Sequence, residues 1–285
     1  MRYVAPSTLE EASAFLVDAN GNGRVLAGGT DLLVQLRAGM ANPETIVDVK
    51  HIDELMTIRQ EADGIRIGAA VCGQAMGEHT ALRNTWSGLV EATELIGSTQ
   101  VQGRASAGGN LCNASPAADS VPAMIAAGAT VSVFGPDGGR EMAVEDFAIA
   151  PGKTSLKKGE FVTSIKLPAR PARSGDAYLR MTPRTEMDIA IVGLGVALTL
   201  DDDGTVTAAR VGLGAVAPTA MLVKDAGDAL VGSKLDDEAL ERAAEACRKA
   251  CNPINDKRGT IEYRTKISGV LMKRVTKIAA ERAGS

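Results

Sequence analysis

Two glycine doublets, far apart along the chain, are the residues best suited to hold a ligand. Gly28-Gly29 lies in the segment AGGTDL (27–32), and Gly108-Gly109 opens a stretch of small residues at 106–130. Glycine lets backbone N–H groups approach a ligand closely, and successive N–H groups turned the same way form a concave anion site. Two such segments suit a ligand with two phosphates, or one long ligand held from both sides. The alternative is a pair of small-residue turns that only pack against other elements.

Both doublets are flanked by signals of regular structure. Val25-Leu26 predicts a short strand before the first doublet, and residues 31–38 predict a helix after it. After the second doublet, Asp119-Ser120 and Pro122 predict the start of a helix, because Asp or Ser can cap a helix and Pro is tolerated in its first turn. We therefore expect a Gly-Gly turn in both places. Neither segment reads G-x-G-x-x-G or Gly-Lys-Ser/Thr, so the usual Rossmann and P-loop signatures are missing.

Composition and charge narrow the class of protein. The chain has 285 residues, of which 45% are apolar and 23% charged, so it can bury a sizeable core, with two or three subdomains. Its net charge of −4 does not suggest a nucleic-acid partner. The sequence has no run of about 18 apolar residues, so we expect no membrane span. No apolar segment of a signal peptide follows Arg2, so we expect a cytoplasmic protein.

Metal-binding residues are few. The spacing of the four cysteines fits neither an iron–sulfur nor a zinc signature, and the two histidines are too few for a His-rich site. We therefore predict no metal site on this chain.

Hydrophobic periodicity predicts the other elements. A β–α–β unit is expected at 1–54, and residues 169–175 read as a linker. The second unit is expected to hold strands at 64–69, 130–134, 144–147 and 161–167, with helices at 73–82, 84–97 and 121–127. The last part is expected to hold strands at 177–181, 189–200 and 205–213, with helices at 219–231, 236–250 and 261–283. This pattern predicts the α+β class, ending in a small antiparallel sheet covered by helices.

The two doublets also carry a family resemblance. AGGTDLLVQLRAG and GSTQVQGRASAGGNLCNASPAADSVPAMIAAGATV resemble the two FAD-pyrophosphate loops of the molybdenum hydroxylase flavoproteins. That family contains the medium, FAD-binding subunit of carbon monoxide dehydrogenase and the corresponding domain of xanthine dehydrogenase. The resemblance implies a PCMH-type FAD-binding domain with subdomains at 1–54 and 55–168, followed by a C-terminal flavoprotein domain at 176–285.

The resemblance further implies FAD as the cofactor and a set of residues that contact it. These are Leu26, Ala27, Gly28, Gly29, Thr30, Asp31, Leu32, Ala107, Gly108, Gly109, Asn110, Asn113, Ser115, Asp119, Arg180 and Ile189. Asp119 resembles an acid that binds ribose or adenine-side groups, although it could equally cap the helix at 121–127, or do both. Arg180 matches a basic position near the flavin, where a cation would stabilise the anionic reduced ring; the alternative is a solvated loop. Ile189 stands where some relatives have an aromatic residue over the ring.

The function implied by the resemblance is electron transfer. In this family a large subunit binds molybdopterin, a small subunit carries two [2Fe–2S] clusters, and electrons leave through FAD to an acceptor. The expected assembly is a dimer of heterotrimers, and no residue of this chain is expected to be catalytic. There are two alternatives. The first is a free-standing FAD-dependent oxidoreductase; the absence of His beside either doublet counts against it, and Cys112 is the one weak candidate for covalent attachment of the flavin. The second is a non-catalytic interaction module.

Overall fold

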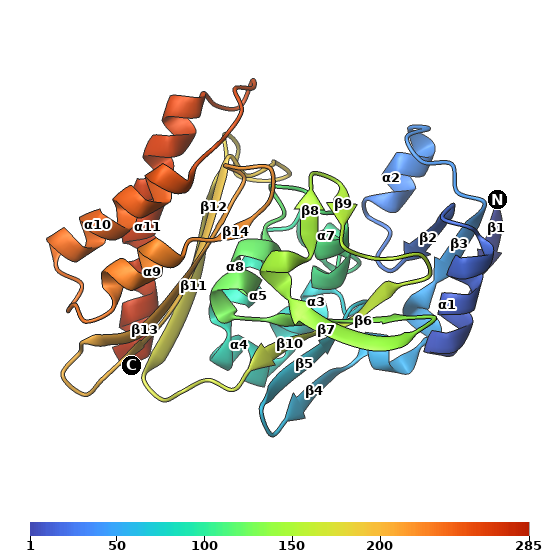
Figure 1. The fold of residues 1–285 in the computed structure, drawn as a ribbon, viewed down its shortest axis with the longest axis horizontal. Coiled ribbons are helices and arrows are strands. Elements are labelled where there is room, and N and C mark those ends of the chain that lie inside the picture. The colour runs from blue at the N-terminus through green and yellow to red at the C-terminus, as the bar shows by residue number, and fades with distance from the viewer. Residues whose placement is uncertain (285) are drawn as a thin grey trace.

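A small parallel sheet begins the chain, shown in blue at the right of Figure 1. The computed structural model describes residues 1–284. The strands lie in the order β1 (Arg2–Val4), β3 (Thr45–Asp48), β2 (Gly23–Leu26). The helix α1 (Leu9–Asp18) begins after Thr8, whose Oγ1 accepts a hydrogen bond from the Glu11 N–H. The remaining elements of this part are α2 (Leu32–Arg37) and the short 3-10 turns η1 (Val49–His51) and η2 (Asp53–Met56).

An antiparallel sheet of five strands forms the middle of the molecule (Figure 1). Its strands lie in the order β4 (Ile58–Glu61), β5 (Gly64–Gly68), β10 (Phe161–Pro168), β6 (Thr130–Gly135), β7 (Gly138–Ala143). A short hairpin, β8 (Ala148–Ala150) and β9 (Lys153–Thr154), stands beside it. The helices of this part are α3 (Gly73–Glu78), α4 (Thr80–Thr85), α5 (Ser87–Glu94), α6 (Thr99–Gln102), α7 (Ala107–Cys112) and α8 (Ser120–Ala127).

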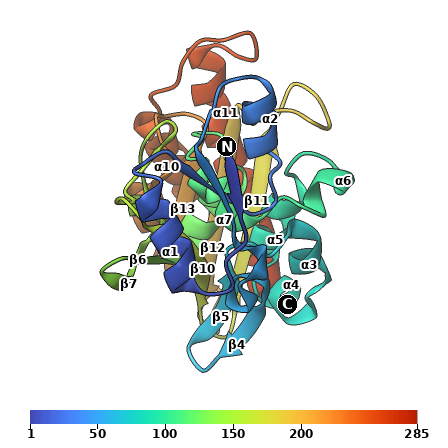
Figure 2. The same cartoon turned by 90° about the vertical axis from the view of Figure 1, so that its right-hand side faces the viewer.

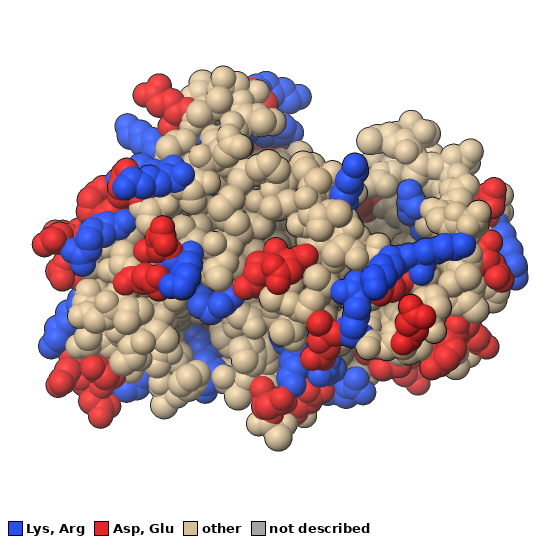
Figure 3. Space-filling model, in the orientation of Figure 1, with Lys and Arg blue, Asp and Glu red and all other residues tan. Residues whose placement is uncertain are grey.

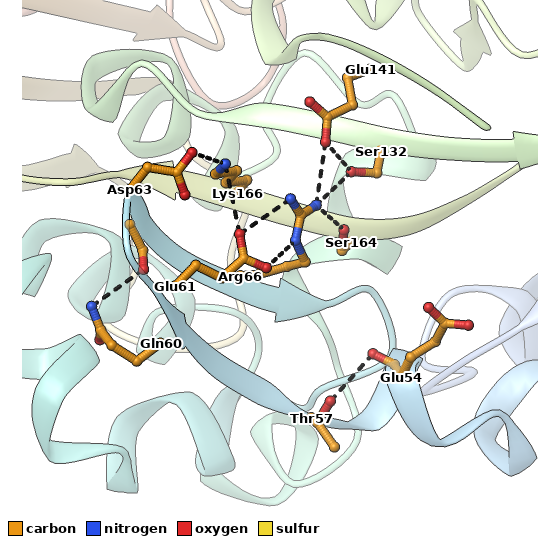
Figure 4. A network of polar contacts seen from close by, with 11 residues as sticks. Glu54, Thr57, Gln60, Glu61, Asp63, Arg66, Ser132, Glu141, Ser164 and Lys166 are labelled. Carbon is orange, nitrogen blue, oxygen red and sulfur yellow. Dashed lines mark hydrogen bonds and ion pairs between the residues drawn. The ribbon is translucent and has the colours of Figure 1, made fainter.

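The two faces of the middle sheet differ in polarity. Alternate residues such as Ile65, Ile67 and Val131 are buried in the core with residues of the helices. On the opposite face, Figure 4 shows Arg66 at the centre of a polar network that spans all five strands of the sheet. The Arg66 Nε donates to Glu61 Oε1 at 2.6 Å, and its Nη1 donates to Ser132 Oγ at 2.8 Å. One face therefore carries the core and the other faces water, as antiparallel sheets allow.

A third sheet, also antiparallel, carries the C-terminal part at the left of Figure 1. Its order is β11 (Ser174–Met181), β12 (Val192–Leu200), β13 (Val206–Gly214), β14 (Met221–Leu222). Its helices are α9 (Lys224–Leu230), α10 (Asp237–Ala250) and α11 (Ile261–Gly284). These helices share one apolar core with the sheet. The arrangement confirms the predicted α+β class and the C-terminal sheet covered by helices.

Glycines in the third sheet let α8 of the middle part lie directly on it. Gly193 pairs with Gly214, and Gly195 pairs with Gly212, on the neighbouring strands β12 and β13. A Cβ atom added at Gly212 would lie 2.0 Å from the carbonyl oxygen of Pro122 in α8. Glycine inside a strand often marks such a close approach of another backbone. The middle and C-terminal parts are therefore joined by a tight contact.

Several predicted elements are wrong in detail. Residues 144–147, predicted as a strand, form the 3-10 turn η3 (Val144–Asp146). In such a turn residues i and i+3 lie on the same side, and Val144 and Phe147 are both buried in the core. The two helices predicted at 73–82 and 84–97 are instead the three helices α3, α4 and α5. The first predicted helix is divided at His79, whose side chain accepts a hydrogen bond from the Leu82 N–H and so caps α4. The strands β4, β7 and β14 were not predicted.

No helix within residues 1–284 combines the length and the apolar character that crossing a bilayer requires.

Candidate cofactor site

Both glycine doublets line one cleft of about 550 Å³. Its walls come from three stretches of the chain that are far apart in sequence. The lining residues lie at 16, 23–25, 27–32, 35 and 49 in the first stretch, at 69, 96, 105–106, 108–110 and 112–113 in the second, and at 152, 154, 156 and 160–162 in the third. The predicted site residues in the lining are Ala27, Gly28, Gly29, Thr30, Asp31, Leu32, Gly108, Gly109, Asn110 and Asn113. The structure thus brings the two doublets together.

The first doublet forms the predicted turn. Gly29 has φ of +78°, a conformation that side chains disfavour. A Cβ atom at Gly28 would lie 1.9 Å from the carbonyl oxygen of Arg104, so the loop lies against the segment that leads to the second doublet. The N–H groups of residues 28–32 donate no hydrogen bond to any part of the chain that the structure describes. Five consecutive free N–H groups beside a cleft form a set of donors for an anionic ligand.

The second doublet was wrongly predicted as a turn. Gly108 and Gly109 lie in the first turn of α7, which begins after Ser106. The Ser106 Oγ accepts a hydrogen bond from the Gly109 N–H at 3.0 Å and so caps the helix. A Cβ atom at Gly108 would lie 2.4 Å from the carbonyl oxygen of Ala69, so this glycine lets α7 pack on the middle sheet.

Gly109 has a different role from its neighbour. A Cβ atom at Gly109 would meet only the Ser106 Oγ, at 3.1 Å, and nothing else within 4 Å. Because Gly109 lines the cleft, an added methyl group would take up space in the cleft instead of pressing on the protein.

Hydrogen bonds hold the walls of the cleft in place. The Gln35 Nε2 of α2 donates to Asn113 Oδ1, just after α7, at 3.5 Å. The Asn110 Oδ1 accepts hydrogen bonds from the N–H group of Ser120 at 3.2 Å and from its Oγ at 2.7 Å. The cleft lining is thereby connected to the start of α8 and, through α8, to the third sheet.

Asp119 lies outside the cleft lining, and it does not cap α8 with its side chain. Its carboxylate accepts hydrogen bonds from the Tyr178 hydroxyl at 3.0 Å and from Arg180 Nη1 at 2.8 Å. Burial raises the pKa of Asp119 to about 6, against the opposing effect of the Arg180 charge. Arg180 is itself buried, so the alternative of a solvated loop is wrong for this residue.

The other predicted residues also lie outside the lining. Leu26 ends β2, Ala107 is buried at the start of α7, and the Ser115 Oγ accepts a hydrogen bond from the Ala117 N–H. Ile189 is half exposed, and its N–H group donates to the carboxylate of Asp188. The contacts of these residues, and of Asp119 and Arg180, with a cofactor stay predictions.

Two family models together span nearly the whole chain. The model described as FAD binding domain in molybdopterin dehydrogenase matches residues 1–170, and the model described as CO dehydrogenase flavoprotein C-terminal domain matches residues 177–279. The chain belongs to the FAD-binding medium-subunit family of the carbon monoxide and xanthine dehydrogenases. Its cofactor is therefore FAD, and its activity class is that of an oxidoreductase subunit.

Members of this family resemble the chain over its full length. The carbon monoxide dehydrogenase medium chain of Afipia carboxidovorans is 34% identical over 281 residues, which are 99% of this chain and 97% of that protein. The nicotinate dehydrogenase FAD-subunit of Eubacterium barkeri is 30% identical, over 95% of this chain and 93% of that protein. A crystal structure of carbon monoxide dehydrogenase from Hydrogenophaga pseudoflava contains a chain with a TM-score of 0.95 and 33% identity, covering 99% of this chain and 98% of that one.

The cleft of this flavoprotein fits FAD. The free N–H groups of residues 28–32 suit the diphosphate, and the space in front of Gly109 accommodates a ligand where a side chain would intrude. Arg24 was not predicted from the sequence, although it lines the cleft; it makes no ion pair with any acid in the described part of the chain. The lining at residues 152–162 was not predicted either. No motif marks that stretch, which holds the hairpin strand β9, the loop after it and the start of β10.

Proposed function

We propose that this chain is the electron-transfer subunit of a heterotrimeric molybdenum hydroxylase. In this proposal FAD lies in the cleft, receives electrons from [2Fe–2S] clusters on a small partner subunit and passes them to an external acceptor. A large partner subunit binds molybdopterin, two heterotrimers associate, and the complex works in the cytoplasm. The observation that carries the proposal is the single cleft lined by both doublets, with five free N–H groups at residues 28–32.

Each wall of the cleft has a role in this proposal. The N–H groups of residues 28–32 bind the diphosphate, and the Arg24 guanidinium offsets part of its charge. Gly109 leaves room for the cofactor, and the Gln35–Asn113 hydrogen bond keeps the two walls at a fixed separation. FAD itself supplies the redox chemistry when it is bound. The chain then needs no acid or base of its own for a substrate.

The relatives support a role within a complex. They are named as the medium chain of carbon monoxide dehydrogenase, the FAD-subunit of nicotinate dehydrogenase and the FAD-binding subunit of xanthine dehydrogenase. The match with this chain covers 97%, 93% and 97% of their respective lengths, so the similarity extends over nearly the whole of each relative. Within the residues that the structure describes, no group of three or more side chains is placed to hold a metal ion. The proposal places the metal-containing steps on the partner subunits.

Co-expression with candidate large and small partner subunits tests the proposal. We expect the three chains to purify together and the FAD to become reduced when the substrate of the complex is added. The chain alone, loaded with FAD, should show the flavin spectrum but no reduction by that substrate. Reduction of the FAD by a substrate on the isolated chain would favour a free-standing oxidoreductase and overturn the proposal. A colourless chain that binds no added FAD would also overturn it.

A further inference from the structure

A lysine side chain holds the carbonyl group just before the first glycine doublet. The Lys50 Nζ, in η1, donates hydrogen bonds to Ala27 O at 3.1 Å and to Asp48 Oδ1 at 2.6 Å. The Lys50 side chain is 24% exposed and that of Asp48 only 6%. Hydrogen bonds from an ionised donor are stronger than those between neutral groups. This arrangement therefore differs from the fully exposed ion pairs of a protein surface, which contribute little.

The bond to Lys50 fixes the orientation of one peptide group of the loop. The carbonyl of Ala27 and the N–H of Gly28 belong to one planar trans peptide, so they point in opposite directions. A cation that holds the carbonyl on one side therefore directs the N–H to the other. Gly28 lines the cofactor cleft, whereas Lys50 does not. Figure 3 shows this cleft as the hollow between the first part of the chain and the rest of the surface.

The glycine doublet makes such a support necessary. Glycine adopts many backbone conformations, so the peptide groups of a Gly-Gly loop rotate at little cost. Within the described part of the chain, Lys50 is the only side chain that forms a hydrogen bond with the backbone of residues 27–32. The orientation of the Gly28 N–H therefore depends on this one contact.

The first sheet holds Lys50 in place. Asp48 ends β3, and its Oδ1 also accepts a hydrogen bond from the Lys50 N–H at 3.1 Å, while its Oδ2 accepts one from the Tyr3 hydroxyl of β1 at 2.6 Å. In the sheet, Asp48 pairs with Leu26, the last residue of β2 before the loop. Figure 1 shows β1 outermost and β2 nearest the middle part, and in Figure 2 the N-terminus, where β1 begins, faces the viewer. The contacts thus run across the sheet from its outer edge to the cleft.

The charge of Asp48 is maintained by its partners. Burial raises the pKa of Asp48, but the hydrogen bonds from Lys50 and Tyr3 outweigh this effect and leave the pKa below its usual value. At neutral pH the carboxylate is therefore ionised and keeps the Lys50 ammonium beside Ala27 O.

We propose that Lys50 is a positioning residue for the FAD diphosphate, acting through the peptide between Ala27 and Gly28. The inference rests on the proposed function, in which the N–H groups of residues 28–32 bind the diphosphate. Besides orienting the peptide, the ammonium polarises it, and this makes the Gly28 N–H a stronger hydrogen-bond donor. Lys50 lies outside the cleft lining, so its effect on the cofactor passes through the loop.

The substitution Lys50→Met tests the inference, because it keeps a long unbranched side chain but removes the charge and the donors. It also leaves Asp48 buried without its cation, which is itself costly. Asp48→Asn combined with Lys50→Met is therefore the second variant, in which both charges are absent. The matched control is Lys166→Met, because the Lys166 side chain is 21% exposed and also pairs with an acid, but on the polar face of the middle sheet (Figure 4).

Two measurements are made on each full-length chain. Fluorescence titration gives the FAD affinity. Hydrogen exchange, followed by mass spectrometry on the peptide that spans residues 27–32, shows whether saturating FAD slows exchange of the loop N–H groups. We expect both Lys50 variants to bind FAD at least tenfold more weakly and to lose most of the FAD protection at residues 28–32. Lys166→Met should match wild type in both measurements.

Wild-type FAD affinity in both Lys50 variants would overturn this inference alone. Weaker binding in the single variant only would do the same, because the loss would then come from the unpaired charge of Asp48. Weaker binding with full protection of residues 28–32 would also contradict it, since the loop would still donate to the cofactor. A wild-type chain in which FAD slows no exchange at residues 28–32 would instead overturn the placement of the diphosphate in the proposed function, and this inference with it.

Discussion

Asp119 illustrates how burial changes the behaviour of a single side chain. Its pKa is raised from 3.8 to about 6, so the folded protein binds its proton more tightly than the unfolded chain does. Between about pH 4 and pH 6 the folded state therefore holds more protons at this position. The contribution of Asp119 to the free energy of unfolding falls as pH rises through this window and stays constant above it. Arg180 and Tyr178 limit the loss, because both stabilise the charged form.

Replacing Tyr178 with Phe removes one of these two partners without changing the packing of the ring. We expect the free energy of unfolding to fall by about 1–3 kcal/mol at pH 7, since the lost hydrogen bond goes to a charged, buried acceptor. The loss should be smaller at pH 5, where Asp119 is largely protonated. Urea unfolding at the two pH values measures both. An equal loss at pH 5 and pH 7 would show that Asp119 is not the group that titrates.

Cys112 provides a chemical probe of the cleft. Its side chain is exposed and lines the cleft, so a thiol reagent can reach it, and its alkylation is followed at alkaline pH, where the reactive thiolate forms. We expect added FAD to slow alkylation in proportion to the fraction of protein that has bound it. Mass spectrometry of the peptide measures the rate, and Cys112→Ser removes the reactive position as a control. The same rate with and without FAD would mean that the cofactor binds elsewhere.

At the scale of elements, the contact between α8 and the third sheet depends on glycine. The paired glycines of β12 and β13 leave no Cβ atoms between the sheet and the backbone of Pro122 and Ala123. This contact fixes α8, and α8 in turn places Ser120, which holds the cleft residue Asn110. A change in the third sheet therefore reaches the cleft through one helix.

The substitution Gly212→Ala tests this contact. Its Cβ atom would lie 2.0 Å from a backbone oxygen, so the helix or the strand has to move. We expect a loss of about 1–3 kcal/mol in the free energy of unfolding, together with weaker FAD binding. Gly139→Ala is the control, because its Cβ atom would meet only Val133 O at 3.8 Å. If both variants unfold at the same urea concentration, the contact is looser than the structure shows.

The sequence predicted the elements well where a local signal was present. The cap at Thr8, the turn at Gly28-Gly29 and the apolar strand that ends at Leu200 all follow from local spacing. The prediction from sequence was wrong where tertiary packing determines the local structure. Gly108 and Gly109 are helical because the Ser106 side chain caps the first turn of α7. Gly108 has no side chain at a point where the helix lies against the backbone of Ala69. A doublet of glycines alone does not distinguish these two structures.

The whole molecule shows why the site could be predicted only in part. The two doublets carry recognisable motifs, and the structure places both at one cleft. The third wall, at residues 152–162, comes from the hairpin strand β9, the loop after it and the start of β10, and local sequence does not encode where these segments lie relative to the doublets. Asp119 and Arg180 lie beyond this cleft lining and pair with each other, a long-range contact between α8 and β11.

The FAD affinity of the Gly109→Ala variant is the most direct test, because a substitution at this position reduces the space for the ligand without disturbing the packing of the protein. The new methyl group would meet only the Ser106 Oγ and would otherwise enter the cleft. We predict that FAD binds at least tenfold more weakly, a change of about 1.4 kcal/mol, while the urea midpoint of the FAD-free protein stays that of wild type and of Gly139→Ala. Fluorescence titration measures the affinity. Unchanged FAD affinity in a folded Gly109→Ala protein would contradict the claim that the two doublets enclose the cofactor.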